Sequence, residues 1–421
     1  MFISGMSGNE IYCLGLKGFQ PGEITVGNSV YAMGLGGALG AMGRSISGGE
    51  ITQYTQLISD GRHAALKRME DEAQRHQAVG ITGVTTELGT MAGFTEFLAQ
   101  GTAIHAQGYQ GRFFSTAASG IGLYCQLDAG YHPVHFVMGN IAYALGVGRG
   151  LVGSFRTLAK GEVKEFSSMY NDIRHTALRR LRQEAAEAGA NAVVDVRVEM
   201  LPFGPGTVEL LLTGTASFHP ALSQGPVSEE QVVTSELSGE ELWNLAQVGL
   251  VPHQIVMATS VYSLGFVGGV GALFKSIQRG ELGEVTQLIY EARENCLGLI
   301  RQDAQRLGAA QVIGNRLQIR ELGSGMVEVV AVGTAVRRAS EGMGTQTQQL
   351  IPQAVIVDGP SRDEGSKITG LQIGSGPMTA ARSRVGAAGS GLVGGIIALL
   401  VVSMFCCFGV IVPIIAGIFG S

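Results

Sequence analysis

Charged residues are scarce in this chain of 421 residues: Asp, Glu, Lys and Arg together make up 15%, against roughly 25% in a typical soluble domain. The chain therefore has little material for a solvated surface, which fits extensive burial between subunits. Neither sign of charge dominates, because 34 acidic residues stand against 29 basic ones and the net charge is −5. Without a basic excess, nucleic acid is not an expected partner.

Two features of exported proteins are also missing. The N-terminal stretch MFISGMSGNEIY has neither the basic region nor the apolar region of a signal peptide. The cysteines form no CxxC pair and no disulfide framework, which fits a reducing compartment. They are Cys13, Cys125, Cys296, Cys406 and Cys407. We therefore expect the polar part of the chain to be intracellular.

Charge is absent altogether from the C-terminal end. No charged residue follows Arg384, and residues 391–420 form an almost unbroken apolar run that is long enough to cross a bilayer. We expect a transmembrane anchor over residues 388–420, which either crosses once or bends at Pro413. Because Arg382 and Arg384 precede this anchor, the positive-inside tendency places the repeats described next on the cytoplasmic side.

Glycine, by contrast, is abundant with 64 residues, and one long pattern recurs three times. The clearest aligned positions are Ser7, Ser119 and Ser238; Pro21, Pro133 and Pro252; and Tyr31, Tyr143 and Tyr262. Their spacing divides the chain into repeats over residues 1–112, 113–231 and 232–340. Residues 341–387 follow as a linker, whose two short strand-like runs are consistent with a β-hairpin.

Each repeat contains the same order of elements. It opens with a short amphipathic run, where the S-x-x-E spacing of Ser7 with Glu10 and of Ser238 with Glu241 predicts a capped helix. A proline-led strand, a Gly-rich segment, a long amphipathic helix and two further strands follow. The aligned aromatic residues that we expect to anchor the short helix on the sheet are Tyr12, Tyr124 and Trp243. We therefore predict an α+β fold of three tandem small domains, each a β-sheet packed with one long and one or two short helices.

These motifs resemble a known family. The long helices contain RHAAL and RHTAL, a strand begins with GANAVVDVRVE, and the last strand contains LLTGTA. This combination is similar to the YbjQ-type family, whose members are labelled heavy-metal-binding domains, and the resemblance covers all three repeats. It implies small α+β domains that assemble into pentameric rings.

From this resemblance we expect a homo-oligomer, with a pentamer as the implied form. Five parallel chains would then make a cylinder of three tiers, one tier for each repeat, with their anchors meeting the bilayer together. The function that fits is a membrane-anchored scaffold or cap whose cargo the sequence does not reveal. A heavy-metal-binding or metal-homeostasis protein is the alternative from a different class.

One arginine and one glutamate recur at aligned positions in every repeat. They are Arg62, Arg174 and Arg293 in the long helices, and Glu96, Glu209 and Glu328 in the last strands. We expect them to form an ion pair, either within each repeat or across a subunit boundary. We interpret them, with Tyr31, Tyr143 and Tyr262, as structural or interface positions. No Ser-His-Asp, Cys-His or paired-carboxylate group recurs beside them, so we do not expect an enzyme.

Candidate metal ligands are few. His63 aligns with His175, and Cys13 aligns with Cys125, but the third repeat has other residue types at both positions. An arginine precedes each histidine, and such a helix face is more often solvated or paired with a carboxylate than bound to metal. The cysteines read as small buried thiols. No cofactor is predicted from these four residues, although a metal ion bound between subunits fits the same ligand types.

The Gly-rich segments offer a third alternative. Arg44, Arg149 and Lys275 place positive charge within them, beside backbone amides that glycine leaves accessible. Such amides and cations together bind small anions or lipid headgroups. Lipid or small-anion binding is therefore kept as an alternative function.

Overall fold

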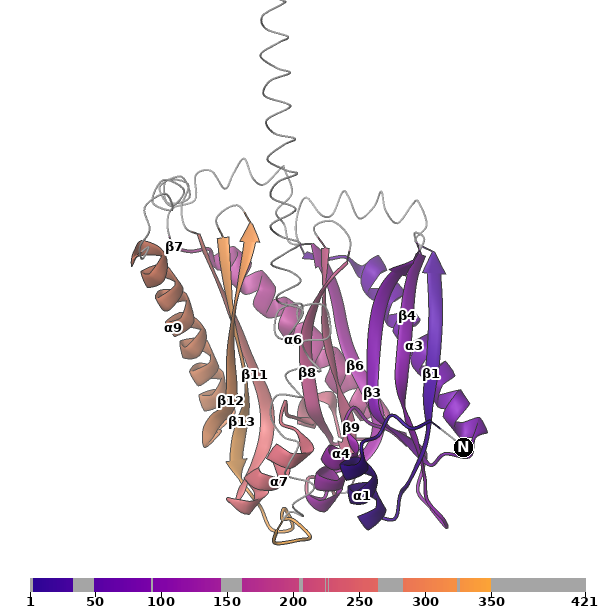
Figure 1. Cartoon of the computed structure of the whole chain (residues 1–421). Coiled ribbons are helices and arrows are strands. Elements are labelled where there is room, and N and C mark those ends of the chain that lie inside the picture. The colour runs from indigo at the N-terminus through magenta and orange to yellow at the C-terminus, as the bar shows by residue number, and fades with distance from the viewer. Residues whose placement is uncertain are drawn as a thin grey trace, which may run out of the picture. The chain divides into compact units, whose positions relative to one another are not determined.

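The structure, a computed structural model, has an α+β fold in which three β-sheets alternate with three long helices (Figure 1). All described residues belong to one compact unit, Met1–Val357. They are residues 3–32, 49–91, 94–144, 161–203, 207–223, 225, 227–263, 283–323 and 326–349. The predicted fold class and the three sheet-rich domains are confirmed.

Each sheet is built around three long antiparallel strands. The first sheet, of order β1-β4-β3-β5, contains β1 (Gln20–Ala32), β3 (Gly80–Met91), β4 (Phe94–His105) and β5 (Phe114–Ser115). The second, of order β10-β8-β9-β6-β2, contains β2 (Gly49–Glu50), β6 (His132–Ala144), β8 (Ala192–Pro202), β9 (Thr207–Phe218) and β10 (Val233–Thr234). The third, of order β12-β13-β11-β7, contains β7 (Gly161–Glu162), β11 (Leu250–Ser263), β12 (Gln311–Gly323) and β13 (Met326–Arg338).

The described residues contain three short and three long α-helices. The short ones are α1 (Gly8–Leu16), α4 (Gly120–Asp128) and α7 (Gly239–Gln247); the long ones are α3 (Thr52–Arg75), α6 (Lys164–Glu187) and α9 (Gly283–Arg306); a 3-10 turn, η1, covers Glu229–Gln231. Both predicted capping boxes are confirmed, because the backbone N–H of Ser7 donates to Glu10 Oε2 and that of Ser238 donates to Glu241 Oε2, each at 2.7 Å.

The long helices approach their own sheets very closely at two glycines. A Cβ at Gly27 of β1 would lie 2.0 Å from the carbonyl oxygen of Ala65, and one at Gly139 of β6 would lie 2.1 Å from that of Ala177. Only glycine permits this contact between helix backbone and strand backbone. Because the helix is held so close to the strand, its flank also reaches the next sheet along the chain.

A β-bulge interrupts the first strand of each sheet hairpin at the same place. The residues at this position, Gly83, Asp195 and Gly314, all have positive φ, between 55° and 66°. Glycine adopts this conformation without strain, and Asp tolerates it better than most residues. The bulge is therefore a repeated element of the domain.

The three repeats exchange short strands with one another. Strand β2 of the first repeat pairs with β6 of the second, and β7 of the second pairs with β11 of the third. In return β5, which opens the second repeat, pairs with β3, and β10, which opens the third, pairs with β8. The repeats of one chain therefore lie side by side in sequence order. This arrangement corrects the expected cylinder of three tiers, in which repeats of one chain would have stacked above one another.

The sequence predicts that the aligned aromatic residues anchor the short helices on a sheet, but in the structure they do not. Tyr124 and Trp243 are buried in a cluster with Cys13 and Cys125, between the short helices of successive repeats. Tyr12 is 48% exposed. The prediction was wrong because the short helices pack on one another when the repeats lie side by side.

No helix within the described part of the chain is both long and apolar enough to cross a membrane. The anchor expected over residues 388–420 lies outside the described residues, as does the hairpin expected in the linker, because the description ends at Gln349. The linker residues 341–349 that are described form turns and bends against the repeats.

Candidate functional site at the junctions between repeats

The first junction is centred on a buried ion pair between two repeats. Arg62 of α3 donates from Nη2 to Glu209 Oε2 of β9 at 2.8 Å and from Nε to Oε1 at 3.3 Å. Both side chains are fully buried. Thr86 accepts a third bond from the guanidinium, and Asn140 donates to the carboxylate. A bidentate pair with these extra partners meets the condition under which two buried charges are tolerated.

The second junction contains the equivalent ion pair, with one hydrogen bond between the two side chains in place of two. Arg174 of α6 donates from Nη2 to Glu328 Oε1 of β13 at 2.7 Å, and both side chains are again buried. Thr259, which aligns with Asn140, donates its hydroxyl to the same carboxylate oxygen at 3.0 Å. Two of the three recurrent arginines are thus paired with a recurrent glutamate, neither within a repeat nor across a subunit boundary, because each pair joins one repeat to the next in the same chain.

One arginine and one glutamate of the six are left over at the two ends of the series. Arg293 lies exposed on α9 of the third repeat, and Glu96 lies half-buried on β4 of the first. Within the described residues neither side chain has an ion-pair or hydrogen-bond partner. When three equivalent repeats are joined in a row, each helix arginine pairs with the glutamate of the following repeat. Two pairs then form, and the glutamate of the first repeat and the arginine of the last stay without a partner from the series.

A hydroxyl on each of the helices α3 and α6 also binds the edge of the next sheet. The backbone N–H of Ala142 in β6 donates to Thr55 Oγ1 at 2.9 Å, and that of Val261 in β11 donates to Ser167 Oγ at 2.9 Å. Thr55 and Ser167 occupy aligned positions near the start of the helices. The beginnings of α3 and α6 are therefore fixed to the neighbouring sheet as well as to their own.

A charged contact near the surface joins the first two long helices. His63 Nε2 lies 3.2 Å from Glu184 Oε1, and His63 Nδ1 lies 2.8 Å from the carbonyl oxygen of Ser59. The hydrogen bond and charge of Glu184 raise the pKa of His63 to about 9, in spite of partial burial, which acts in the opposite direction. His63 is therefore a cation at neutral pH and forms an ion pair.

The short helices meet at Asp128, which the sequence analysis missed. This fully buried carboxylate accepts hydrogen bonds from Lys17 Nζ at 2.9 Å, Trp243 Nε1 at 2.8 Å and the Thr347 hydroxyl at 2.8 Å. Burial acts to raise the pKa of Asp128, but these bonds outweigh it and hold the pKa below its usual value. Asp128 thus ties all three repeats and the start of the linker together. No acidic residue occupies the aligned positions, so the repeat pattern held no signal for it.

The aligned tyrosines lie at the ends of the long strands beside these junctions. Tyr143 and Tyr262 are buried, and Tyr31 is half-buried. Tyr143 packs edge to face against Tyr170 of α6, with ring centroids 5.6 Å apart, whereas Tyr31 packs against Phe97 of its own sheet at 5.9 Å. Their role in the described residues is packing.

The residues proposed as weak metal ligands do not fit a metal site. Burial raises the pKa of both Cys13 and Cys125, so the thiolates that bind metal ions are disfavoured. His63 is occupied by its contacts with Glu184 and Ser59, and His175 lies on the aligned, exposed face of α6. Within the described ranges, no group of three or more His, Cys, Asp or Glu side chains could hold a metal ion.

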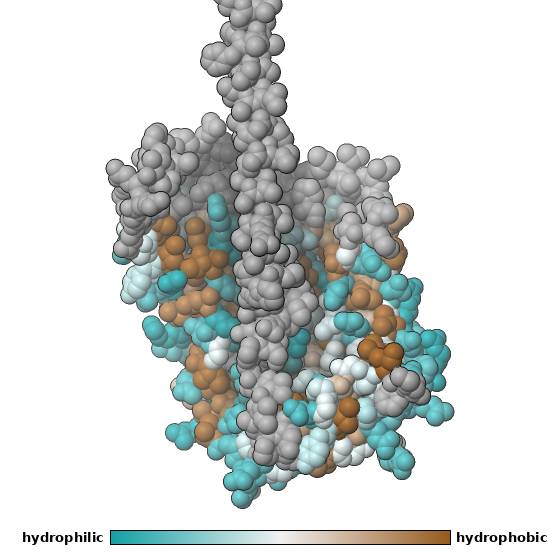
Figure 2. Space-filling view, viewed as in Figure 1, coloured by the Kyte–Doolittle hydropathy of each residue, from teal (hydrophilic) through white to brown (hydrophobic). Residues whose placement is uncertain are grey.

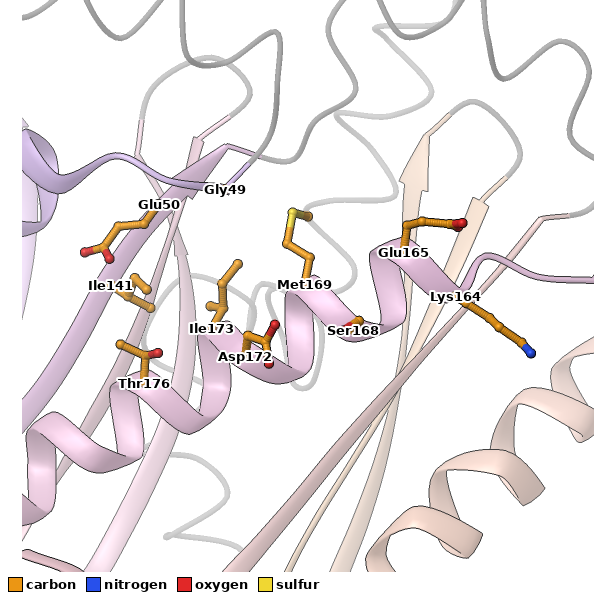
Figure 3. A pocket seen from close by; sticks show the side chains of 10 residues that line it. All are labelled: Gly49, Glu50, Ile141, Lys164, Glu165, Ser168, Met169, Asp172, Ile173 and Thr176. Carbon is orange, nitrogen blue, oxygen red and sulfur yellow. The ribbon is translucent and has the colours of Figure 1, made fainter.

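A wide groove of about 680 Å³ opens where strand β2 meets α6 (Figure 3). The side chains that line it are those of Glu50, Ile141, Lys164, Glu165, Ser168, Met169, Asp172, Ile173 and Thr176, with Gly49. Its carboxylates outnumber its one lysine, so the groove does not suit an anion. The residues proposed for anion binding, Arg44, Arg149 and Lys275, lie outside the described residues.

Comparison with known proteins identifies the repeated unit. The model of the family YbjQ, described as "Putative heavy-metal-binding", matches residues 19–107, 131–219 and 248–339. An encapsulin nanocompartment protein of Mycobacterium tuberculosis is 32% identical over 228 residues, which are 51% of this chain and 85% of that protein. A UPF0145 protein of Thermoplasma volcanium is 44% identical over 71 residues, 17% of this chain and 58% of its own length. A UPF0145 protein of Thermosipho melanesiensis is 39% identical over 80 residues, 19% of this chain and 74% of its own length.

Proposed function

Because the chain belongs to the YbjQ family, of which it carries three tandem copies, we propose that it is a self-assembling scaffold attached to a membrane. The observation that carries this proposal is the series of junctions. Buried ion pairs and exchanged strands join successive repeats, and the unmatched halves of the same junction remain at both ends. A unit that has used its binding surfaces twice within the chain is suited to use them again between chains.

The likeness to an encapsulin nanocompartment protein supports an assembly role. That relative is named for a protein compartment, and the likeness covers 85% of its length. We therefore propose that copies of this chain form a ring, cap or compartment that organises a cargo. A homo-oligomer is the first requirement of this function, and the pentamer implied by the family resemblance is one form that it could take.

Attachment to the membrane is the second part of the proposal. It rests on the apolar run at residues 391–420, with Arg382 and Arg384 before it, and the repeats then face the cytoplasm. Such an anchor would hold each copy in the same orientation relative to the bilayer. Association of the repeats would then take place in two dimensions, which raises the effective concentration of their complementary faces.

Native mass measurement and negative-stain imaging of the full chain in detergent test this function. We expect particles that contain two or more chains, with closed or curved outlines. A single chain at every protein concentration would contradict the proposal. Removal of residues 388–420 should release the chain from membranes, whereas the repeats should keep their fold.

The two alternatives stay predictions. The family description favours heavy-metal binding. Within the described residues, no group of side chains forms a metal site. Lipid or small-anion binding concerns Gly-rich segments that lie outside them. Elemental analysis of the purified protein after dialysis tests the first, and mass spectrometry of extracted small molecules tests the second. We also do not propose an enzymatic activity.

A further inference from the structure

Exposed hydrophobic side chains are unevenly distributed among the repeats. Of the large hydrophobic residues that are exposed in the described part of the chain, every one belongs to the first repeat or the third, and none lies between residues 113 and 231. On the face shown in Figure 2, hydrophobic side chains gather in patches among polar ones. The central repeat has a neighbour on both sides, and each terminal repeat has a neighbour on one side only. The missing neighbour therefore explains the exposed surface.

Within the described residues, no helix covers the outer face of the first repeat. On β1, Ile24 and Val26 are 43% and 45% exposed, whereas the aligned Phe136 and Met138 of β6 are 1% and 3% exposed. The difference arises because α3 packs against β6 as well as against β1, and α6 packs likewise against β11. Among the described elements no long helix covers this face of β1, so it is equivalent to the face of β6 without the helix that covers it there (Figure 1).

The outer face of the third repeat presents a helix that has no second sheet. On α9, Thr286 takes the position that Thr55 and Ser167 hold in the other long helices, and its side chain is exposed. In both junctions that hydroxyl accepts a backbone N–H from the next sheet. On β1, Val30 aligns with Ala142 and Val261, and it is 50% exposed. Thr286 and the Val30 amide are thus the matching halves of a third hydrogen bond.

The recurrent ion pair has its matching halves on the same two faces. Arg293 is exposed on α9, and Glu96 is half-buried beside β1, which pairs with β4 at this register. Asn28 of β1 aligns with Asn140, whose amide donates to the junction glutamate. A helix placed on β1 as α3 is placed on β6 would bring Arg293 to Glu96 with the same polar neighbour.

The two outer faces also carry opposite charges at a second pair of aligned positions. In the first junction Glu70 Oε1 of α3 lies 3.3 Å from His135 Nδ1 of β6. The aligned residues in the second junction are Arg182 and Gln254, and Arg182 Nη1 donates to Gln254 Oε1 at 3.3 Å. The residues aligned with them at the free ends are Arg301 on α9 and Glu23 on β1, and both are exposed. The position of His63 is taken by Glu294, so the ion pair between His63 and Glu184 has no counterpart there.

We infer that the outer face of the third repeat binds the outer face of the first repeat in a second copy of the chain, through the same junction that joins repeats within it. This inference rests on the proposed function of self-assembly and names its partner and its surfaces. The association is head to tail, because the two faces differ. A closed ring of such junctions holds three repeats for every chain. Two chains would supply six repeats, and five chains would supply fifteen in a single ring.

Charge reversal in the full chain in detergent tests this inference. Arg293→Glu places a carboxylate opposite Glu96, and Glu96→Arg places a cation opposite Arg293. Each variant alone should therefore associate about 30-fold more weakly than the wild type or worse. When the two variants are mixed, every junction between unlike variants joins opposite charges, so chains that alternate should associate again. A chain that carries both changes should recover assembly whatever the number of chains in the ring.

The control makes the same change of charge away from the junction. Lys67 is exposed on α3, and the aligned Arg179 is exposed in the central repeat although both of its junctions are formed. Lys67→Glu should leave the particle mass unchanged. Circular dichroism of each variant checks its fold, and the neutral variants Arg293→Gln and Glu96→Gln, which should also weaken association, provide a second test if a reversed variant does not fold.

Two failures are distinguishable. If the wild type itself is a single chain at every concentration, the proposed function falls together with this inference. If the wild type forms multimers but Arg293→Glu and Glu96→Arg assemble as well as it does, or their mixture stays dissociated, the chain assembles through other surfaces and only this inference falls.

Discussion

Arg62 shows why a recurring charged pair is hard to assign from sequence. Arginine is rarely fully buried unless it is paired, and the alignment did predict a partner glutamate. It could not choose between Glu96 in the same repeat and Glu209 in the next, because both have the same position in the repeat. The choice depends on which sheet the helix flank reaches, and the structure places Glu209 there. The identity of the pair was thus predictable, and its connectivity was not.

We predict that Arg62→Ala destabilises the protein by about 3–5 kcal/mol, because it leaves the buried carboxylate of Glu209 without its counter-charge. Glu209→Ala should cost a similar amount, and the double variant should cost clearly less than both changes together. Denaturant unfolding of the three variants measures this coupling. Lys67→Ala, which removes an exposed pair with Asp71 on the same helix, should change stability by less than about 1 kcal/mol. Additive effects of Arg62→Ala and Glu209→Ala would contradict the role assigned to the pair.

The elements of each repeat were largely predictable, because long amphipathic helices and proline-led strands have strong periodic patterns. The two-residue strands β2 and β7 could not be predicted from the sequence. Two residues are too few to show alternation, and their Gly-Glu sequence has low strand propensity. They form strands only because the neighbouring sheet offers an open edge. These exchanged strands, together with the close contacts at Gly27 and Gly139, hold α3 and α6 each between two sheets.

The contact between helices α3 and α6 should make stability depend on pH. The pKa of His63 is raised from 6.5 in the unfolded chain to about 9 in the folded protein. A raised pKa means that the pair stabilises the folded state fully below pH 6.5 and that this contribution is lost as the pH rises to about 9. The difference in unfolding midpoint between wild type and His63→Gln should therefore be largest near pH 6 and should shrink by pH 10. Glu184→Gln should remove the same dependence, and a difference that stays constant with pH would show that the pair contributes nothing.

At the scale of the whole molecule, the scarcity of charge agrees with the buried junctions between repeats. The ion pairs, exchanged strands and packed short helices bury surface between repeats, so fewer charged residues are needed there. Internal equivalence of the repeats could be read directly from the spacing of aligned residues. The spacing could not show whether equivalent repeats bind one another within a chain or bind their counterparts in other copies, because both arrangements need the same recurring residues. The expected three tiers were wrong for this reason.

The most direct test of the account is a disulfide between two chains at the proposed third junction. Chains with Val30→Cys and chains with Thr286→Cys are mixed and oxidised, because the aligned contacts bring a helix hydroxyl within 2.9 Å of the strand backbone. A single chain with Ser167→Cys and Val261→Cys is the matched control, and it should close internally. We predict a cross-linked product of two chains in the mixture and none in either variant alone or in the wild type. Closure of the control without any cross-link in the mixture would contradict the claim that chains join as repeats do.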